Sequence, residues 1–201
     1  MRRAVERAAA IGGECARAMA QSRDALRAGD ELLARRVVAG DGEIDRQCAA
    51  LEAEVLSILA LAAPLAGDMR RTVAVFKAIS DFERAGDYAG HAARAVRAGA
   101  AAPRDVVAMA DAAAAMLAQA TEALAREDAA LARAVVARDA GVDRLCARVQ
   151  RRLDRDGAPD VESGRWLLAS RALERAADHA VSIAQWALYA AVGERPAVGL
   201  P

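Results

Sequence analysis

Apolar residues recur at helical spacing along most of the chain. Between residues 31 and 62 they form a heptad seam that includes one aspartate: Ala34, Val37, Asp41, Ile44, Cys48, Leu51, Val55 and Ile58. A second seam follows between residues 68 and 98: Val75, Ile79, Phe82, Gly86, Ala89, Ala93 and Val96. Such seams are typical of helices in antiparallel bundles. With the intervening turn residues, the pattern predicts six helices, at 3–28, 31–62, 68–98, 104–125, 129–155 and 161–192.

Turn residues mark the boundaries between the predicted helices. Gly29 followed by Asp30 has the order of a C-terminal glycine and then an N-cap. Pro64 marks the next turn, and Asp68 is the expected cap of the helix that follows. In the second half, residues 127–128 and 157–160 correspond to these two turns. The tail from Gly193 contains prolines and glycines and is expected to fray.

The pattern of the first half of the chain returns in the second half. Residues 33–41 (LARRVVAGD) match residues 131–139 (LARAVVARD) at an offset of 98, and residues 83–87 match residues 174–178 at an offset of 91. The second copy is therefore shorter by seven residues in its middle. We predict an all-α fold of two tandem antiparallel three-helix bundles related by internal pseudo-symmetry. The expected bundles are residues 1–99 and 104–195, with a tail at 196–201.

Four acidic pairs have their members four residues apart: Asp41/Asp45, Glu83/Asp87, Asp139/Asp143 and Glu174/Asp178. On a helix each pair places two like charges on one face, which costs a few tenths of a kcal/mol unless a cation is near. In an antiparallel hairpin about Pro64, residues whose numbers add up to about 128 lie level. Asp41 with Asp87 and Asp45 with Glu83 both meet this condition, and the second copy repeats it about residues 158–159. Each hairpin is thus expected to present four carboxylates at one level, on the rim of its groove.

Partly buried carboxylates need a cation or several arginines nearby. Clusters of oxygen ligands suit hard cations such as Mg²⁺, Mn²⁺ or iron, whereas zinc favours more histidine or cysteine ligands. Cys48 and His91 lie on the carboxylate faces, where each could be an auxiliary ligand or a core or capping residue. The alternative to a metal site is a set of salt bridges. Arg171 could pair with Glu174, but Arg84 and Arg175 are expected to point elsewhere on their helices.

Composition excludes some classes of function. The net charge is zero and aromatic residues make up 3% of the chain, which disfavours a nucleic-acid partner. No apolar run approaches the roughly 18 residues that span a bilayer, and the N-terminus lacks the apolar region of a secretory signal, so we expect no membrane insertion. Three cysteines without a C-x-x-C pair fit a reducing compartment, and a cytoplasmic location is expected.

The order of these motifs resembles the PhoU family of phosphate-uptake regulators. The family pattern is roughly P-x-A-x-D-L-R, then E-R-I-G-D followed by an asparagine one turn later. Residues 64–70 read PLAGDMR and residues 83–87 read ERAGD, and the resemblance extends from about Ile11 to Glu194. The chain departs from the pattern in four places. Cys48 stands where a further acidic residue is frequent, His91 and Ser182 replace asparagines, and Ala177 replaces a glycine.

The resemblance implies a fold of two three-helix bundles and multinuclear metal clusters on the four acidic pairs. It also implies contacts with the ATPase of a phosphate ABC transporter and with a phosphate-sensing histidine kinase. The outcome would be repression of the phosphate-starvation response. Many members dimerise, so a homodimer is expected. With Cys48 in place of an acidic residue, the first cluster is expected to hold fewer metal ions.

Two other functions are alternatives to this regulatory one. A carboxylate-bridged di-iron enzyme would carry Glu-x-x-His on two helices, and neither histidine stands three residues after a glutamate. We therefore expect no enzymatic activity. A plain helical scaffold would treat the acidic pairs as surface charge. A regulator reassigned to another transporter remains a further alternative.

Overall fold

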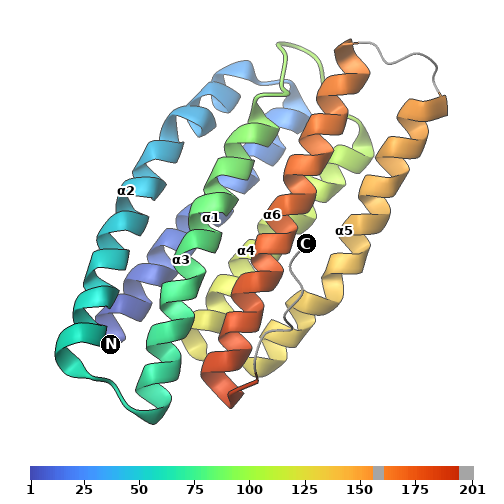
Figure 1. Cartoon of the computed structure of the whole chain (residues 1–201). Helices are drawn as coiled ribbons and strands as arrows, with labels where there is room; N and C mark the ends of the chain where they lie inside the picture. Colours follow the sequence, from blue (N-terminus) through green and yellow to red (C-terminus); the bar gives the residue numbers. More distant parts are fainter. Residues whose placement is uncertain (156–160, 195–201) are drawn as a thin grey trace.

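The computed structural model describes residues 1–155 and 161–194, which form six α-helices (Figure 1). The all-α prediction is confirmed. The helices are α1 (Arg2–Ala28), α2 (Glu31–Ala62), α3 (Ala66–Ala93), α4 (Arg104–Arg126), α5 (Ala129–Arg155) and α6 (Val161–Val192). The tail at 196–201 and the turn about Pro159 lie outside the described residues.

The helices form two layers. In Figure 1, α2, α3, α6 and α5 lie side by side, and α1 and α4 lie behind them. Within each half of the chain every helix packs on the other two, and the halves meet where α3 packs on α6 and α1 on α4. The contact between α3 and α6 is the most extensive in the molecule, and one continuous hydrophobic core runs through both halves. Division into bundles at 1–99 and 104–195 therefore stays a prediction.

The two predicted seams are buried. All the named residues of the α3 seam from Val75 to Ala93 are buried, and Phe82 is the largest fully buried side chain. On α2 the apolar members from Ala34 to Val55 are buried, whereas Asp41 is only half-buried. Removing these apolar side chains from water supplies the main drive for packing α2 on α3. Asp41 is the polar exception within that contact.

The predicted caps are correct at two of three helices. Asp30 and Asp128 each accept a hydrogen bond from a backbone N–H three residues on, at 2.9 Å, which satisfies one of the free donors of the first turn. The prediction for Asp68 was wrong, because α3 begins two residues earlier and has Leu65 as its N-cap. Asp68 lies in the first turn instead, where it forms an ion pair with Arg71 at 3.2 Å.

Helix α3 also ends at Ala93, earlier than the predicted residue 98. The chain beyond it turns back onto the end of α1. Gly99 N–H donates to the carbonyl of Gly29, and Ala102 N–H donates to the carbonyl of Leu26. Gly29 has φ 65°, and a Cβ there would come within 2.7 Å of the Ala100 nitrogen, so only glycine fits. These long-range hydrogen bonds replace the last turn of the expected helix.

Candidate metal site

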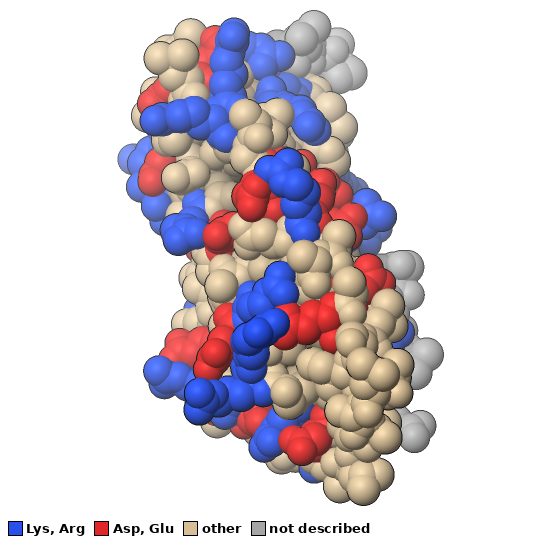
Figure 2. All heavy atoms as spheres, turned by 90° about the vertical axis from the view of Figure 1, so that its left-hand side faces the viewer, with Lys and Arg blue, Asp and Glu red and all other residues tan. Residues whose placement is uncertain are grey.

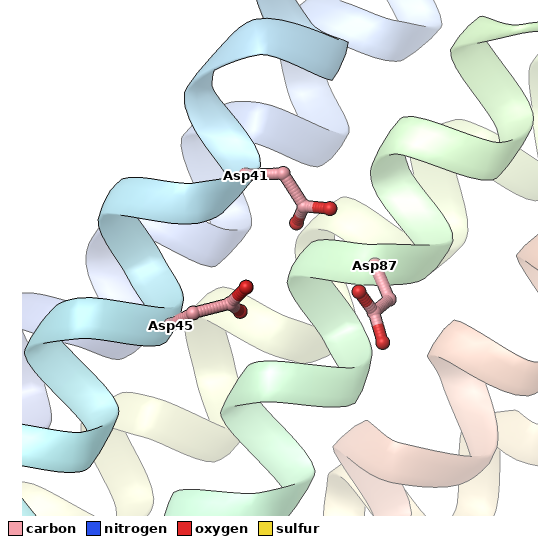
Figure 3. Close-up of side chains that lie close together, drawn as sticks. All are labelled: Asp41, Asp45 and Asp87. Carbon is pink, nitrogen blue, oxygen red and sulfur yellow. The ribbon is translucent and has the colours of Figure 1, made fainter.

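Three carboxylates meet in the groove between α2 and α3. Asp41 and Asp45 lie one helical turn apart on α2, and Asp87 lies opposite them on α3 (Figure 3). Each offers one carboxylate oxygen, and these atoms all lie within 4.8 Å of one another. As the predicted antiparallel hairpin requires, Asp87 lies at the level of Asp41 and Asp45 on the facing helix. We refer to Asp41, Asp45 and Asp87 as the aspartate triad.

Asp41 is the member of the triad with a buried and unpaired carboxylate oxygen. Its Oδ1 atom is buried and has no hydrogen-bond partner. Burial raises the pKa of Asp41, and the charges of Asp87 and Asp45 raise it further, against a weaker opposing effect of Arg94 and His91. A buried carboxylate oxygen without a donor is unfavourable unless a cation satisfies it. The donor set therefore fits a hard cation with oxygen ligands.

Because Gly86 has no side chain, there is room for the Asp41 carboxylate in the groove between α2 and α3. A Cβ at this position would lie 3.2 Å from Ile44 Cδ1 and 3.4 Å from Asp41 Oδ1. At Gly90, one turn further along α3, it would lie 3.9 Å from Asp41 Oδ2. Glycine at position 86 therefore lets α2 approach α3 with a carboxylate between them, whereas a Cβ at Gly90 would make only an ordinary van der Waals contact. In the second copy Ala177 and Val181 occupy the equivalent positions.

Glu83 does not belong to the aspartate triad. Its charge acts instead on Cys48, one turn below: burial raises the pKa of that thiol to about 12, with further contributions from Glu83 and Asp45. The thiol is therefore protonated at neutral pH in the metal-free protein. His91 lies on the other side of the triad, with its ring edge-on to Tyr88 at 5.7 Å between centroids.

The second hairpin brings its four acidic residues near one another more loosely. Burial raises the pKa of Asp139 to about 6, and Asp143, Asp178 and Glu174 all add to the effect. The pKa of Asp178 is also raised, first by burial. The structure describes all eight acidic residues. Among the described residues, a group of three that each offer a ligand atom within 4.8 Å of the others is found only in the first hairpin. The two candidate sites are thus unequal.

Arginines pair with three of the eight acidic residues, always from the same helix. Arg171 donates to Glu174 at 2.8 Å, as the sequence suggested. Arg84 and Arg175 pair with Asp87 and Asp178 at 3.4 and 3.5 Å, so the prediction that they point elsewhere was wrong. A residue three positions on lies on the same helix face, which brings these side chains together. Such half-exposed pairs contribute about 0–1 kcal/mol each.

None of these ion pairs joins the two helices of a hairpin. Asp41 and Asp45 form no ion pair with any residue that the structure describes, and neither do Asp139 and Asp143. A network of interhelical salt bridges was the alternative explanation of the acidic pairs. The observed pairs leave the carboxylates of α2 and α5 without such partners, which favours a cation.

A polar contact between the halves was missed in the sequence. Asp81 is buried on α3, where its Oδ1 lies 2.9 Å from His179 Nδ1 and its Oδ2 accepts a hydrogen bond of 2.8 Å from Ser182 Oγ. Both partners are on α6. A signal was present, since Asp81 interrupts a stripe of small buried residues on α3: Ala74, Ala78, Ala85, Ala89 and Ala92. An aspartate in such a stripe needs a polar partner on the facing helix.

Figure 2 shows the side of the molecule formed by α2, where acidic and basic side chains are interspersed. In the part of the chain that the structure describes, no helix combines the length and the apolar character needed to cross a membrane.

Comparison with known proteins tests the resemblance noted in the sequence. The PhoU domain model matches residues 9–96 and 106–187. A PhoU homologue of Deinococcus radiodurans, named as a phosphate-specific transport system accessory protein, is 34% identical over 77% of this chain and 77% of its own length.

Two crystal structures share the fold. PhoU from Pseudomonas aeruginosa has a TM-score of 0.87 and 29% identity, covering 95% of this chain and 96% of that one. The phosphate transport system regulatory protein PhoU from Streptococcus pneumoniae has the same TM-score at 23% identity, covering 98% and 97%. The domain match spans most of the chain in two copies, as the internal repeat predicted. This chain therefore belongs to the PhoU family.

Proposed function

We propose that the chain is a metal-binding regulatory adaptor of phosphate uptake and a negative regulator of the phosphate-starvation response. The observation that carries the proposal is the aspartate triad, with its buried and unpartnered Asp41 Oδ1. Support comes also from the D. radiodurans relative, which is named as an accessory protein of a phosphate-specific transport system. We propose a regulatory and not an enzymatic action, in line with the relatives, which are named as accessory or regulatory proteins.

The expected ions are Mg²⁺, Mn²⁺ or iron, which prefer carboxylate oxygens. A bound cation supplies positive charge that offsets the repulsion among the carboxylates. Asp41 and Asp45 would hold it from α2 and Asp87 from α3, with Glu83 one turn away. In the second hairpin Asp139, Asp143, Glu174 and Asp178 are the proposed ligands, at a site that must tighten on binding. Each site would fix the spacing of the two helices that form it.

The proposed partners are the ATPase of a phosphate ABC transporter and a phosphate-sensing histidine kinase, reached in the cytoplasm. A homodimer is proposed as the assembled form. A regulator of another transporter is the second candidate, since the family fold and the acidic residues do not themselves specify the transported ion. A di-iron enzyme has no observation in its favour.

Deletion of the gene with complementation tests the function. In phosphate-rich medium the deletion strain should express phosphate-starvation genes that the parent strain represses, and the intact gene should restore repression. A gene carrying Asp41→Asn and Asp87→Asn should restore it poorly at equal protein abundance. Unchanged expression of these genes in the deletion strain would contradict phosphate control. A changed uptake of another solute in that strain would support the second candidate.

A further inference from the structure

Each hairpin carries one cysteine three residues after an aspartate of α2 or α5. Cys48 follows Asp45, and Cys146 follows Asp143 at the repeat offset of 98. Residues three apart lie on one helix face, so each thiol shares a face with its aspartate. Both cysteines are buried, with 1% of their surface exposed. The two thiols nevertheless have different surroundings.

In the first hairpin the thiol of Cys48 lies among carboxylates. Its pKa is raised to about 12, first by burial and then by the charges of Glu83, Asp45 and Glu52. Cys48 forms no hydrogen bond with any residue that the structure describes. Glu83 is half-buried and, within the described residues, has neither a hydrogen-bond donor nor a basic partner. A buried thiol and a carboxylate thus face each other without any positive charge between them.

In the second hairpin the corresponding thiol already has partners. Gln150 Nε2 donates a hydrogen bond to Cys146 Sγ at 3.6 Å. The pKa of Cys146 is raised first by burial and then by Glu174, whereas Arg171 lowers it. Arg171 also forms an ion pair with Glu174 at 2.8 Å. The thiol and the glutamate of this hairpin are therefore satisfied by side chains of the protein itself.

Two sequence differences account for this contrast. Glu52 of the first hairpin stands where the second has Gln150, and Ser80 stands where the second has Arg171. The first hairpin therefore lacks an amide donor and a guanidinium and has one more carboxylate. Carboxylates grouped around a sulfur without a positive partner are unfavourable in the metal-free protein and form a ligand set for a divalent cation.

Cys48 extends the acidic groove beyond the aspartate triad. Asp41 and Cys48 lie seven residues apart on the same seam of α2, which is about 10 Å along the helix axis. Asp45 lies between them and points toward α3 (Figure 3). On α3, Glu83 precedes Asp87 by one turn. The triad is thus an all-oxygen position, and Asp45, Cys48 and Glu83 line the next position along the hairpin.

We propose that Asp45, Cys48 and Glu83 bind a divalent cation of the class of Fe²⁺, Co²⁺ and Zn²⁺ through a thiolate and carboxylates. The proposal rests on the proposed function, of which metal binding by this hairpin is a part. A thiolate favours these ions over Mg²⁺ and Mn²⁺, which prefer oxygen ligands. The cation replaces the proton of the thiol: the S–H bond breaks, a sulfur–metal bond forms, and the proton passes to water. The second hairpin forms no such position, because Arg171 and Gln150 already bind its glutamate and its thiol.

Titration of the reduced, metal-free chain with Co²⁺ tests the proposal, because a cobalt–thiolate bond gives a charge-transfer band in the near ultraviolet. The band should appear in the intact chain, and Zn²⁺ should abolish it by displacing the cobalt. It should be lost in Cys48→Ser. Cys146→Ser is the matched control and should keep the band, since it removes the equally buried thiol of the second hairpin.

A second variant keeps Cys48 and changes only its surroundings. Glu52→Gln combined with Ser80→Arg gives the first hairpin the partners found in the second, at two exposed positions where the fold should be retained. This double variant should also lose the band. Circular dichroism and thermal unfolding check that every variant is folded.

A band of equal intensity in Cys48→Ser, or its loss in Cys146→Ser, would overturn the proposal. A band retained by the double variant would overturn it as well, because the surroundings of Cys48 would then not matter. Calorimetric binding of Co²⁺ by the intact chain without such a band would overturn the thiolate and leave the proposed function standing. If the intact chain bound neither Co²⁺ nor Mn²⁺, the proposed metal-binding function itself would fail.

Discussion

Tyr88 and His179 stack across the contact between α3 and α6, with ring centroids 5.6 Å apart and planes inclined by 22°. They occupy equivalent positions of the two repeats, at the offset of 91 that also relates residues 83–87 to residues 174–178. Each directly follows a candidate metal ligand, Asp87 or Asp178. The candidate metal sites of the two hairpins therefore lie on either side of one aromatic contact between α3 and α6.

The hydrogen bonds of Asp81 should contribute measurably to stability. Asp81→Ala leaves His179 and Ser182 without their shared acceptor in a partly buried contact. We expect the free energy of unfolding to fall by about 1–3 kcal/mol, measured by urea denaturation. Asp111→Ala, which removes an exposed partner of Arg23 and Arg27, is the control and should cost less than about 1 kcal/mol. An equal loss in both variants would contradict the role given to Asp81.

Gly86→Ala should weaken metal binding more than it alters the fold. The added methyl group contacts Ile44 and Asp41 and moves α2 away from α3. The better helix propensity of alanine, about 1 kcal/mol, offsets much of the crowding in the metal-free protein. Calorimetric titration with Mn²⁺ should therefore show weaker binding at a similar unfolding temperature.

Gly40→Ala on α2 is the matched control for this substitution, since a Cβ there meets nothing within 4 Å. It should stabilise the protein and leave Mn²⁺ affinity unchanged. Unaltered Mn²⁺ affinity in Gly86→Ala would show that the close approach of the two helices does not matter for the site.

The stability of the metal-free protein should depend on Asp139 in a defined pH range. Its pKa is raised from 3.8 in the unfolded chain to about 6 in the folded one, first by burial and then by neighbouring acids. The folded state thus binds this proton more tightly, so the contribution is fully present below about pH 4 and is lost as the pH rises through about 6. Other carboxyl groups titrate nearby, and a comparison with Asp139→Asn isolates this one.

After EDTA treatment, the free energy of unfolding of Asp139→Asn, relative to that of the intact chain, should increase as the pH rises from about 4.5 to about 7. These two pH values lie below and above the pKa of about 6 that Asp139 has in the folded protein. Urea denaturation at several pH values measures the difference. A difference that stays constant over this range would show that Asp139 has an ordinary pKa.

The backbone strain at Ala63 and Ala66, in the turn between α2 and α3, should be removable. Glycine adopts the left-handed region without the penalty of about 1–2 kcal/mol that a Cβ incurs. Because glycine also increases the entropy of the unfolded chain, Ala66→Gly should raise the free energy of unfolding by no more than about 1 kcal/mol. Ala60→Gly, inside α2, should instead lower it by a similar amount. A lower unfolding temperature for Ala66→Gly would show that the position is unstrained.

Helix positions and the level of the acidic residues could be read from the sequence because both follow from periodicity. The heptad through Asp41 and the equal numbering sums placed Asp41, Asp45 and Asp87 together, as the structure does. The start of α3 could not be read in the same way. Asp68 looks like a cap, but the turn through Ala63 and Ala66 lets the helix begin sooner. Local sequence does not reveal a left-handed alanine.

Contacts between the two halves of the chain also could not be predicted from the hydrophobic periodicity. The pairing of Asp81 with His179 and Ser182 depends on the register of α3 against α6, which are joined by no short turn. Glu83 was expected to lie level with Asp45 and complete a set of four. Spacing along a helix gives the level of a side chain but not its rotamer, and the interaction of Glu83 with Cys48 is a matter of side-chain direction.

Calorimetric titration of Mn²⁺ into metal-free Asp41→Asn tests the central claim most directly, that the aspartate triad holds a hard cation. Asparagine keeps the shape of the side chain and removes the charge, and Glu43→Gln on the exposed side of α2 is the control. The account predicts at least tenfold weaker binding in Asp41→Asn at the first site, with Glu43→Gln unchanged. It also predicts that metal-free Asp41→Asn is at least as stable as the intact chain at neutral pH. Mn²⁺ affinity equal to that of the intact chain, or no binding by the intact chain, would contradict it.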